Sequence, residues 1–362
     1  MKNNIFQDLF VLEIANNHWG DYDRAVKIIT SFAQIVKFNN IRAAIKMQFR
    51  DVDTFIHKDF KNRDDIRYIS KTMKTKMSCD NYAALVDVVK KSGCVTMSTP
   101  FDEASVDLCV NLGVEIIKIA SSDINDWVLI EKIAKTRKPV IVSTGGSSLK
   151  DIDDLVKFFT KREIPLAVNH CVSLYPSEKS DLELNQIDFL KNRYPELVIG
   201  FSTHEYNDDI ESPMLMAYAK GARTFERHVD IEYNGEKPSP YCSTPSDFDR
   251  WVKAYHKAVA ICGSSGDTKR NPPKQEVEYL DALVRGVYAK RDLQPGDVIT
   301  EDEIYLAIPL QQGQISCREL IFGEKVIAPI AKDAPIKIDG IDSPYAYDEK
   351  LKEKIYKRGL AV

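Results

Sequence analysis

The sequence lacks several features that would place it in a specialised class of protein. It has no apolar run long enough to span a bilayer, and its first ten residues, MKNNIFQDLF, contain no apolar signal-peptide core, so we expect a cytoplasmic protein outside the membrane. Its net charge of −4 argues against a basic surface for nucleic acid. No CxxC pair, internal repeat or low-complexity tract is present.

The cysteines are few, single and odd in number, which predicts reduced thiols rather than a disulfide framework. The seven positions are 79, 94, 109, 171, 242, 262 and 317. Cys171 follows His170, a pair that could form a nucleophilic site, but a small buried residue at the end of a strand is the favoured interpretation.

The stretch from Glu115 to Ser148 sets the pattern for the first 262 residues. Two short β-branched runs, Glu115–Ile119 and Pro139–Val142, end abruptly at small polar residues and enclose a segment with helical apolar spacing. This pattern predicts a buried strand, a crossover helix and a second buried strand. Lys118 lies near the carboxyl end of the first strand, where parallel sheets bind ligands, although it could also be a lysine that merely extends out of the strand.

Eight such strand-then-helix units follow one another, which predicts a (β/α)8 TIM barrel. A doubly wound sheet is less favoured because no GxGxxG follows the first strand. The predicted strands are Val11–Ala15, Ala43–Gln48, Val95–Met97, Glu115–Ile119, Pro139–Val142, Leu166–Asn169, Leu197–Gly200 and Thr224–Arg227.

Polar side chains stand at the ends of nearly all these strands, and a barrel would gather them at one mouth. Lys46 and Lys118 predict a site for a phosphate or carboxylate, since an ammonium group binds such oxygens without planar geometry. Thr99, Ser121 and Ser143 could donate hydrogen bonds to the same anion. Glu13, within the first strand, could act as a base or orient water. An internal ion-pair network of Glu13 with a lysine is the alternative.

His204 and His228 end adjacent strands, which lie roughly 5 Å apart in a sheet. Two imidazoles at one level could share a divalent ion and leave positions open for water and substrate. Two histidines on separate strands are also often structural, and spacing alone leaves both interpretations open.

The rest of the chain changes character. Residues 49–78 read as a long irregular loop of the kind that forms lids. Residues 263–282 read as a polar linker, residues 283–345 as a small β-rich domain with turn signals, and residues 346–362 as a charged tail.

Taken in order, many short segments resemble the sialic acid synthase family, whose members condense phosphoenolpyruvate with an amino sugar. The segments are EIANNHWG, KMQF, STPFD, KIASSDI, KPVIVSTGGSS, NHCVSLYPS, IGFSTHE, FERH and AKRDLQPGDVITEDEI, and they cover residues 10–340. The resemblance implies a TIM barrel followed by an antifreeze-like (SAF) domain. It also implies a homodimer in which that domain is swapped and caps the partner's site.

The resemblance assigns roles to positions that match the family's motifs. It implies that Lys46, Thr99, Lys118, Ser121 and Ser143 bind phosphoenolpyruvate. It further implies that His204 and His228 hold Mn2+, with Mg2+ or Co2+ as alternatives, and that Glu13 is the catalytic carboxylate. Gln48 and Tyr175 are implied to contact the acceptor sugar.

The sequence departs from the family at positions implied to face the acceptor. Ser173 stands where the family has Asn, and Asp123 where it has Glu. Ile308, before Pro309, replaces an arginine that reaches the acceptor's N-acyl group, and KPSPYCS lacks the aspartate of the family's Gly-Pro-Asp. We therefore predict an acceptor other than plain N-acetylmannosamine, with Gln311 or Gln312 contacting hydroxyls.

Two other functions are compatible with the same residues. One is a different metal-dependent barrel enzyme, an aldolase or an isomerase, which would need no phosphoenolpyruvate. The other is a catalytically silent sugar-binding homologue, which the changed acceptor positions would permit.

Overall fold

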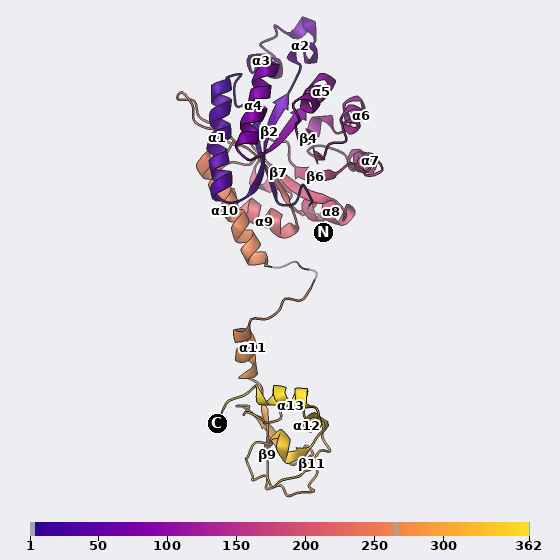
Figure 1. Cartoon of the computed structure of the whole chain (residues 1–362), viewed down its shortest axis with the longest axis vertical. Helices are drawn as coiled ribbons and strands as arrows, with labels where there is room; N and C mark the ends of the chain where they lie inside the picture. Colours follow the sequence, from indigo (N-terminus) through magenta and orange to yellow (C-terminus); the bar gives the residue numbers. More distant parts are fainter. Residues whose placement is uncertain (1–3, 264–265, 267, 362) are drawn as a thin grey trace. The chain divides into compact units, whose positions relative to one another are not determined.

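The computed structural model describes residues 4–263, 266 and 268–361. It divides into two compact units, Met1–Gly263 and Ser264–Val362 (Figure 1). The predicted linker begins at this boundary. Its positions 264, 265 and 267 lie outside the described residues, and its second half is a helix, α11 (Lys274–Asp281), rather than irregular chain. No helix among the described residues is long and apolar enough to cross a membrane.

The first unit is a closed barrel of eight parallel strands, which confirms the predicted TIM barrel. Each strand pairs with the next, and β1 also pairs with β8. The strands are β1 (Leu9–Ala15), β2 (Arg42–Phe49), β3 (Val95–Pro100), β4 (Ile116–Ile119), β5 (Val140–Ser143), β6 (Leu166–Cys171), β7 (Val198–Thr203) and β8 (Thr224–His228).

Helices surround the strands and bury the outward-facing apolar side chains between the two layers (Figure 1). They are α1 (Tyr22–Phe38), α4 (Cys79–Lys91), α5 (Glu103–Asn111), α6 (Trp127–Lys135), α7 (Leu149–Thr160), α8 (Asn185–Arg193), α9 (Glu211–Lys220) and α10 (Pro245–Cys262). Most begin at a side chain that accepts a backbone N–H, such as Ser148 for α7 and Thr244 for α10.

The barrel interior changes from apolar to polar along each strand, and this change positions the site. Val11, Ala44 and Ile116 belong to an apolar cluster inside the barrel. Two residues further along the same strands stand Glu13, Lys46 and Lys118, all at most 5% exposed. Because side chains two apart in a strand share a face, these charged groups point into the carboxyl-terminal end of the barrel.

Residues 49–78 are not the irregular loop that the sequence predicted. They contain α2 (Val52–Phe55), the short 3-10 helix η1 (Lys58–Phe60) and α3 (Arg67–Lys74). The stretch contains neither glycine nor proline to interrupt helical turns. Lys76 and Asp53 form an ion pair of 2.7 Å that joins its two ends.

The second unit is built from two small antiparallel sheets. β9 (Gly286–Ala289) pairs with β10 (Ile304–Ala307), and β11 (Lys325–Val326) pairs with β12 (Ile341–Asp342). Their apolar side chains form a separate core. The helix α12 (Pro344–Tyr347) crosses the predicted start of the tail at residue 346, and the tail itself contains α13 (Glu349–Tyr356), which contributes the buried Ile355 to this core.

Candidate active site

Two buried lysines and two buried glutamates form a connected ion-pair network inside the barrel mouth. Lys46 Nζ lies 2.5 Å from Glu13 Oε2 and 3.0 Å from Glu226 Oε1, and Lys118 Nζ lies 2.9 Å from Glu226 Oε2. Glu226 therefore bridges the two lysines. The alternative interpretation, an internal ion-pair network of Glu13 with a lysine, is partly correct, because Glu13 does pair with Lys46. The same network also lies at the mouth of the barrel.

Burial and the charges of the network shift the pKa values of Glu226, Lys46 and Lys118. Burial disfavours the charged form of Glu226, but the two ammonium groups outweigh it and hold the carboxyl pKa well below its usual range. Burial also lowers the pKa of Lys46, yet Glu13 and Glu226 outweigh it and raise that pKa to about 12. Within the described part of the chain Lys118 has one carboxylate partner, Glu226, and burial lowers the pKa of Lys118.

Three hydroxyl residues predicted to belong to the site lie on β3, on the segment after β4 and on β5, and one of them bonds to the network. Thr99 Oγ1 accepts a hydrogen bond of 3.3 Å from Lys46. Ser121, in the short helix η2 (Ser121–Asp123), accepts from the Gly145 N–H at 3.0 Å. The Ser143 side chain is 3% exposed, and its hydroxyl has no partner among the described residues. A buried hydroxyl of this kind is suited to a ligand oxygen.

The two histidines lie side by side at the same mouth. Their ring centroids are 5.2 Å apart, and Glu13 is in register with both Lys46 and His228. The His204 Nδ1 is 2.8 Å from the Val172 carbonyl, which makes Nδ1 the protonated nitrogen and leaves Nε2 to bind a ligand. The two lysines and the two histidines therefore do share one opening.

The histidines are neutral in the absence of a ligand. Burial lowers the pKa of His204 from 6.5 to about 4. Burial, followed by the charges of His204 and Lys46, lowers the pKa of His228 well below 6.5. A neutral imidazole is the form that binds a metal ion.

The neutral, paired imidazoles fit a divalent ion that has two protein ligands. Within the described ranges, no group of three or more His, Cys, Asp or Glu side chains is placed to hold a metal. Water and substrate would fill the remaining positions of an ion bound here, which leaves the site open for catalysis.

Aromatic and amide side chains form the outer wall. The Tyr175 ring lies 4.1 Å from that of His204 and 5.4 Å from that of Tyr241, which in turn packs at 5.3 Å on His228. Gln48 Nε2 donates to Glu13 at 2.8 Å.

Asp123 and Ser173 are two of the positions that depart from the family's motifs. Burial raises the pKa of Asp123, and its Oδ2 has no partner in the described part of the chain. Ser173 is exposed and lies beside Gly145, where an added Cβ would meet its hydroxyl oxygen at 2.1 Å.

The sequence analysis missed Glu226 and Tyr241. The periodicity of the strand could have identified Glu226. Thr224, Glu226 and His228 are every second residue of β8 and so face the barrel interior together. Tyr241 lies in the irregular segment KPSPYCS, where spacing gives no orientation. In the structure the ring of Tyr241 forms part of the rim of the barrel mouth.

Second-layer contacts hold the loops that carry the histidines. Arg227, on the outward face of β8, is fully buried and pairs with Glu205 at 2.8 Å, immediately after His204. Arg24 is also fully buried and joins the loops after β1 and β8 through Asp230 at 2.7 Å.

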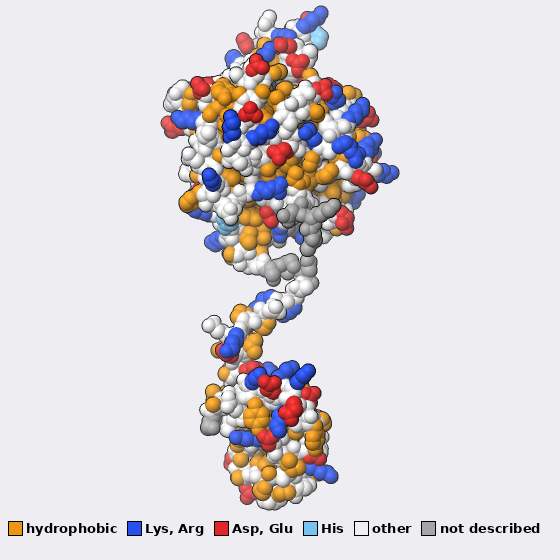
Figure 2. All heavy atoms as spheres, viewed as in Figure 1, with side chains coloured by type: hydrophobic (Ala, Val, Ile, Leu, Met, Phe, Trp, Pro, Cys, Tyr) orange, Lys and Arg blue, Asp and Glu red, His pale blue; other side chains and the backbone are white. Residues whose placement is uncertain are grey.

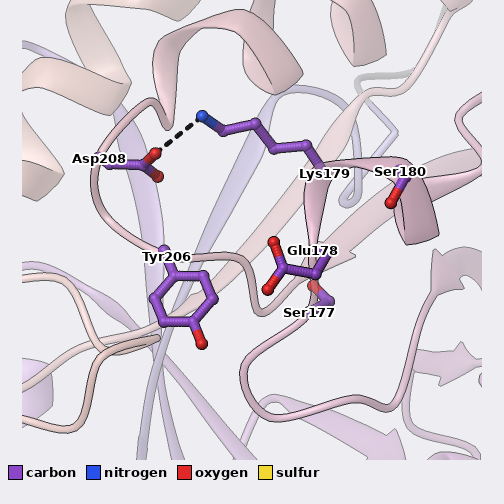
Figure 3. Close-up of a pocket in the computed structure, with 6 residues that line it drawn as sticks. All are labelled: Ser177, Glu178, Lys179, Ser180, Tyr206 and Asp208. Carbon is purple, nitrogen blue, oxygen red and sulfur yellow. Dashed lines mark hydrogen bonds and ion pairs between the residues drawn. The ribbon is translucent and has the colours of Figure 1, made fainter.

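A hollow of about 290 Å³ lies beside the mouth, between the loops after β6 and β7 (Figure 3). Its lining residues are Ser177, Glu178, Lys179, Ser180, Tyr206 and Asp208. Lys179 and Asp208 form an ion pair of 2.9 Å across it. The Ser177 N–H donates to the His204 carbonyl at 3.1 Å, so the hollow directly adjoins the histidine loop.

Comparison with known proteins identifies the family of the chain. The model of the NeuB family matches residues 28–267, and the model of the SAF domain matches residues 284–342. The chain therefore belongs to the NeuB family, and its second unit contains a SAF domain.

Individual relatives agree with this assignment. The chain is 26% identical over 309 residues to an N,N'-diacetyllegionaminic acid synthase of Campylobacter jejuni, covering 82% of this chain and 89% of the relative. A crystal structure from Chromobacterium violaceum, assigned to a spore coat polysaccharide biosynthesis protein E, superposes with a TM-score of 0.88 at 36% identity, covering 93% of this chain and 100% of that one.

A second solved structure is an N-acetylneuraminic acid (sialic acid) synthetase from Leptospira borgpetersenii, in complex with citrate. It superposes with a TM-score of 0.66 at 28% identity, covering 76% of this chain and 91% of that one. The Campylobacter jejuni and Leptospira borgpetersenii relatives are thus both named as synthases of sugar acids.

Proposed function

We propose that this chain is a nonulosonic-acid-type synthase that condenses phosphoenolpyruvate with an aldose or amino sugar. The products are inorganic phosphate and a 2-keto-3-deoxy sugar acid three carbons longer than the acceptor. Family membership and the named synthases among its relatives support the reaction class. The observation that carries the proposal is the meeting of Lys46, Lys118 and the two imidazoles at one mouth.

The charges of the site support an anionic donor. Two lysines and two glutamates cancel, so the network of Lys46, Lys118, Glu13 and Glu226 has no net charge. A divalent ion on His204 and His228 would leave two positive charges in a buried site, where they act strongly on phosphoenolpyruvate. Bound there, the ion supplies Lewis acidity that polarises the acceptor's carbonyl group.

The residues of the chain then have distinct tasks. Lys46 and Lys118, with Thr99, Ser121 and Ser143, hold the phosphate and carboxylate of phosphoenolpyruvate in a fixed position. C3 of the donor attacks the aldehyde carbon, and water adds at C2 of the resulting cation. Phosphate leaves by cleavage of its C–O bond.

In this proposal Glu13 orients the attacking water. It lies next to His228 in the β1–β8 register and is held by Lys46 and Gln48. Gln48, Asp123, Ser173 and Tyr175 line the space that remains for the acceptor.

The acceptor differs from plain N-acetylmannosamine in our proposal. Ser173 and Asp123 are shorter than the family's residues, and Tyr241 packs against His228 in the segment that lacks the usual aspartate. In the SAF unit Ile308 is 60% exposed, and an apolar side chain there cannot replace the hydrogen bonds of an arginine.

The test of the function is phosphate release from phosphoenolpyruvate in the presence of Mn2+ and a panel of aldoses. We expect release only with a suitable aldose, and none after chelation. Turnover of an aldose without phosphoenolpyruvate would favour the aldolase or isomerase. Ordinary efficiency with N-acetylmannosamine would contradict the altered acceptor.

Metal binding has its own test in the paramagnetic resonance signal of Mn2+. We expect wild type and the control His256→Ala to bind one ion, and His204→Ala and His228→Ala to lose it, since removing one ligand of a weak site costs roughly 10-fold or more in affinity. Absence of binding in wild type would favour the silent homologue.

We also propose that the chain is a cytoplasmic homodimer in which the SAF domain is exchanged between protomers, as the family resemblance implies. Light scattering should give twice the chain mass. A monomer with full activity on both substrates would show that exchange of the SAF domain is not required for activity, and would contradict this proposal.

A further inference from the structure

Asn207 lies in the loop after β7 and has no part in the function proposed above. Its side-chain amide makes four hydrogen bonds, the full number that one amide group can form. Nδ2 donates to the carbonyls of Pro240 at 3.0 Å and Cys242 at 2.9 Å. Oδ1 accepts from Arg227 at 2.9 Å and from the Ser243 hydroxyl at 2.9 Å. Asn207 therefore joins the loop after β7 to the end of β8 and to the segment that follows it.

The chemistry of its neighbours determines the orientation of the Asn207 amide. Carbonyl oxygens only accept hydrogen bonds, so Nδ2 faces Pro240 and Cys242, and a guanidinium group only donates them, so Oδ1 faces Arg227. In the reversed orientation the amide oxygen would lie against two carbonyl oxygens. The amide thus holds its two sets of partners in one fixed arrangement.

The two carbonyls that Asn207 holds belong to the residues on either side of Tyr241. These three residues, Pro240, Tyr241 and Cys242, lie in an irregular segment of turns. Pro240 has no N–H to donate, and the Cys242 N–H donates to the Ser239 carbonyl at 2.8 Å within the turn itself. Because Tyr241 does not belong to a helix or a strand, the bonds from Asn207 on both sides of it fix its backbone.

Tyr241 belongs to a cluster of aromatic rings at the barrel mouth. Its ring centroid lies 5.3 Å from that of His228 and 5.4 Å from that of Tyr175. The Tyr175 ring in turn lies 4.1 Å from that of His204. Rings at these separations pack favourably on one another. The position of Tyr241 therefore sets one wall of the space beside the two histidines.

The partners of Asn207 are buried, unlike the charged side chains at the surface of the first unit. On the face that Figure 2 shows, basic and acidic side chains are interspersed, and exposed pairs of opposite charge contribute little to stability. Arg227 and Ser243 are fully buried, and Cys242 is 1% exposed. A buried polar group that loses its partner cannot bond to water instead, so the bonds of Asn207 are costly to break.

We propose that Asn207 is a positioning residue that holds Tyr241 in place and thereby sets one wall of the space for the acceptor sugar. This inference rests on the function proposed above, in which the acceptor lies beside the two histidines. Asn207 acts through Tyr241 rather than by contact with the acceptor, because all the hydrogen-bonding positions of its amide are occupied within the chain. Tyr241 is then a residue that determines which acceptor fits.

The variant Asn207→Asp separates the two sides of this link. Its carboxylate keeps an oxygen for Arg227 and Ser243, but its second oxygen faces the carbonyl oxygens of Pro240 and Cys242 and repels them. With an aldose that wild type converts, we expect the KM for the aldose to rise about 10-fold, the size that one or two lost hydrogen bonds produce. The KM for phosphoenolpyruvate should not change, and a rise in it would overturn the inference.

A double-mutant cycle with Tyr241→Ala shows whether Asn207 acts through Tyr241. We expect Tyr241→Ala to raise the KM for the aldose at least as much as Asn207→Asp does. The double variant should be no worse than Tyr241→Ala alone, because a wall that has been removed cannot also be displaced. Losses that add in the double variant would mean that Asn207 acts by another route.

Mn2+ binding distinguishes a displaced Tyr241 from damaged histidines. In Asn207→Asp the paramagnetic resonance signal should show the same ion binding as in wild type, because the bond to Arg227 is retained. Loss of ion binding relative to wild type would show that Asn207 acts on His204 and His228 instead, and would contradict the inference.

Hydrogen exchange tests the link without the reaction. In the free protein with EDTA, amides in peptides that span residues 239–243 should exchange about 10-fold faster in Asn207→Asp than in wild type, because the segment loses two hydrogen bonds. Asn207→Ala should show the same acceleration and serves as the test if the Asp variant does not fold. The control Asn39→Asp makes the same change in an amide at the end of α1, which bonds Ile35 and Asp249, and should leave these peptides unchanged.

The outcomes separate this inference from the proposed function. Exchange at the wild-type rate in both Asn207 variants would show that Asn207 does not hold the segment, and the inference would fail. Absence of phosphate release with every aldose would instead contradict the proposed function and would leave the exchange result standing.

Discussion

Glu226 is the residue on which the electrostatics of the mouth depend. It is 4% exposed and bridges Lys46 and Lys118, which originate on separate strands. Removing one partner from a buried ion pair leaves the other charge uncompensated. Glu226 therefore stabilises the charged forms of both lysines.

The first prediction concerns Glu226→Gln. We expect the variant to be destabilised by about 3 kcal/mol or more and to lose phosphoenolpyruvate binding, because Lys118 loses its carboxylate partner. Urea denaturation and calorimetry measure the two effects. The control Asp107→Asn breaks an exposed pair with Lys132 and should cost about 1 kcal/mol or less. Equal stability of the two variants would contradict the bridging role.

The second prediction concerns pH. Burial lowers the pKa of His18 to about 4 in the folded chain, whereas an unfolded histidine has a pKa of roughly 6.5. The unfolded state therefore binds more protons below pH 6.5, and stability is lost as the pH falls toward 4. Between pH 7.5 and pH 5 this residue accounts for about 2 kcal/mol.

His18→Asn isolates that contribution, because the amide oxygen can replace Nδ1 as acceptor of the Gly20 N–H. Urea denaturation in EDTA should show a smaller loss of stability on acidification for this variant than for wild type. An identical pH dependence in the two proteins would mean that His18 titrates normally.

The position of a single site residue could be predicted where a charged or titratable residue ended a predicted strand. A lysine or histidine at the end of an apolar run was visible in the sequence, so Lys46, Lys118, His204 and His228 were placed together. Glu226 was missed because it lies between Phe225 and Arg227, which face the helices, and the motif was read for its histidine. The roles of all these residues stay predictions.

At the scale of elements, the C-terminal tail is part of the second unit. Leu360 forms a parallel bridge with Gln311, and the Gln312 N–H donates to the Leu360 carbonyl. Arg358 also pairs with Glu319. The tail thus holds the segment 310–312, which contains the two glutamines that we expected to face the acceptor.

The third prediction follows from α13. Ile355 is 2% exposed in the core of the second unit, so Ile355→Ala should lower the stability of that unit by about 2–4 kcal/mol. The control Lys350→Ala removes an exposed side chain of the same helix and should change stability little. Thermal unfolding measures both, and an unchanged Ile355→Ala would mean that the tail is dispensable.

Elements were predictable to differing degrees for physical reasons. Buried parallel strands show as apolar runs, so all eight strands could be recognised. The strands β3, β6 and β7 continue two or three residues past their predicted ends, because the residues there are polar. The insertion at residues 49–78 was read as irregular because its polar composition conceals short helices whose apolar contacts are few. The burial of Ile355 was likewise hidden, because one apolar residue among lysines and glutamates forms no visible pattern.

At the scale of the whole molecule, the fold and the family are established, while the acceptor rests on proposal. The change from apolar to polar residues along each strand predicts the end of the barrel at which ligands bind. It does not predict which ligand fits, because the rim is built from Tyr175, Tyr241 and the insertion, whose side chains no periodicity orients.

The most direct test of the account is to supply phosphoenolpyruvate labelled with 13C at all three carbons, with Mn2+ and the aldose panel, and to identify the products by mass spectrometry. We predict a sugar acid that contains all three labelled carbons and appears in equal amount with phosphate. Label recovered only as pyruvate or as unchanged phosphoenolpyruvate, with every aldose returned intact, would contradict the account.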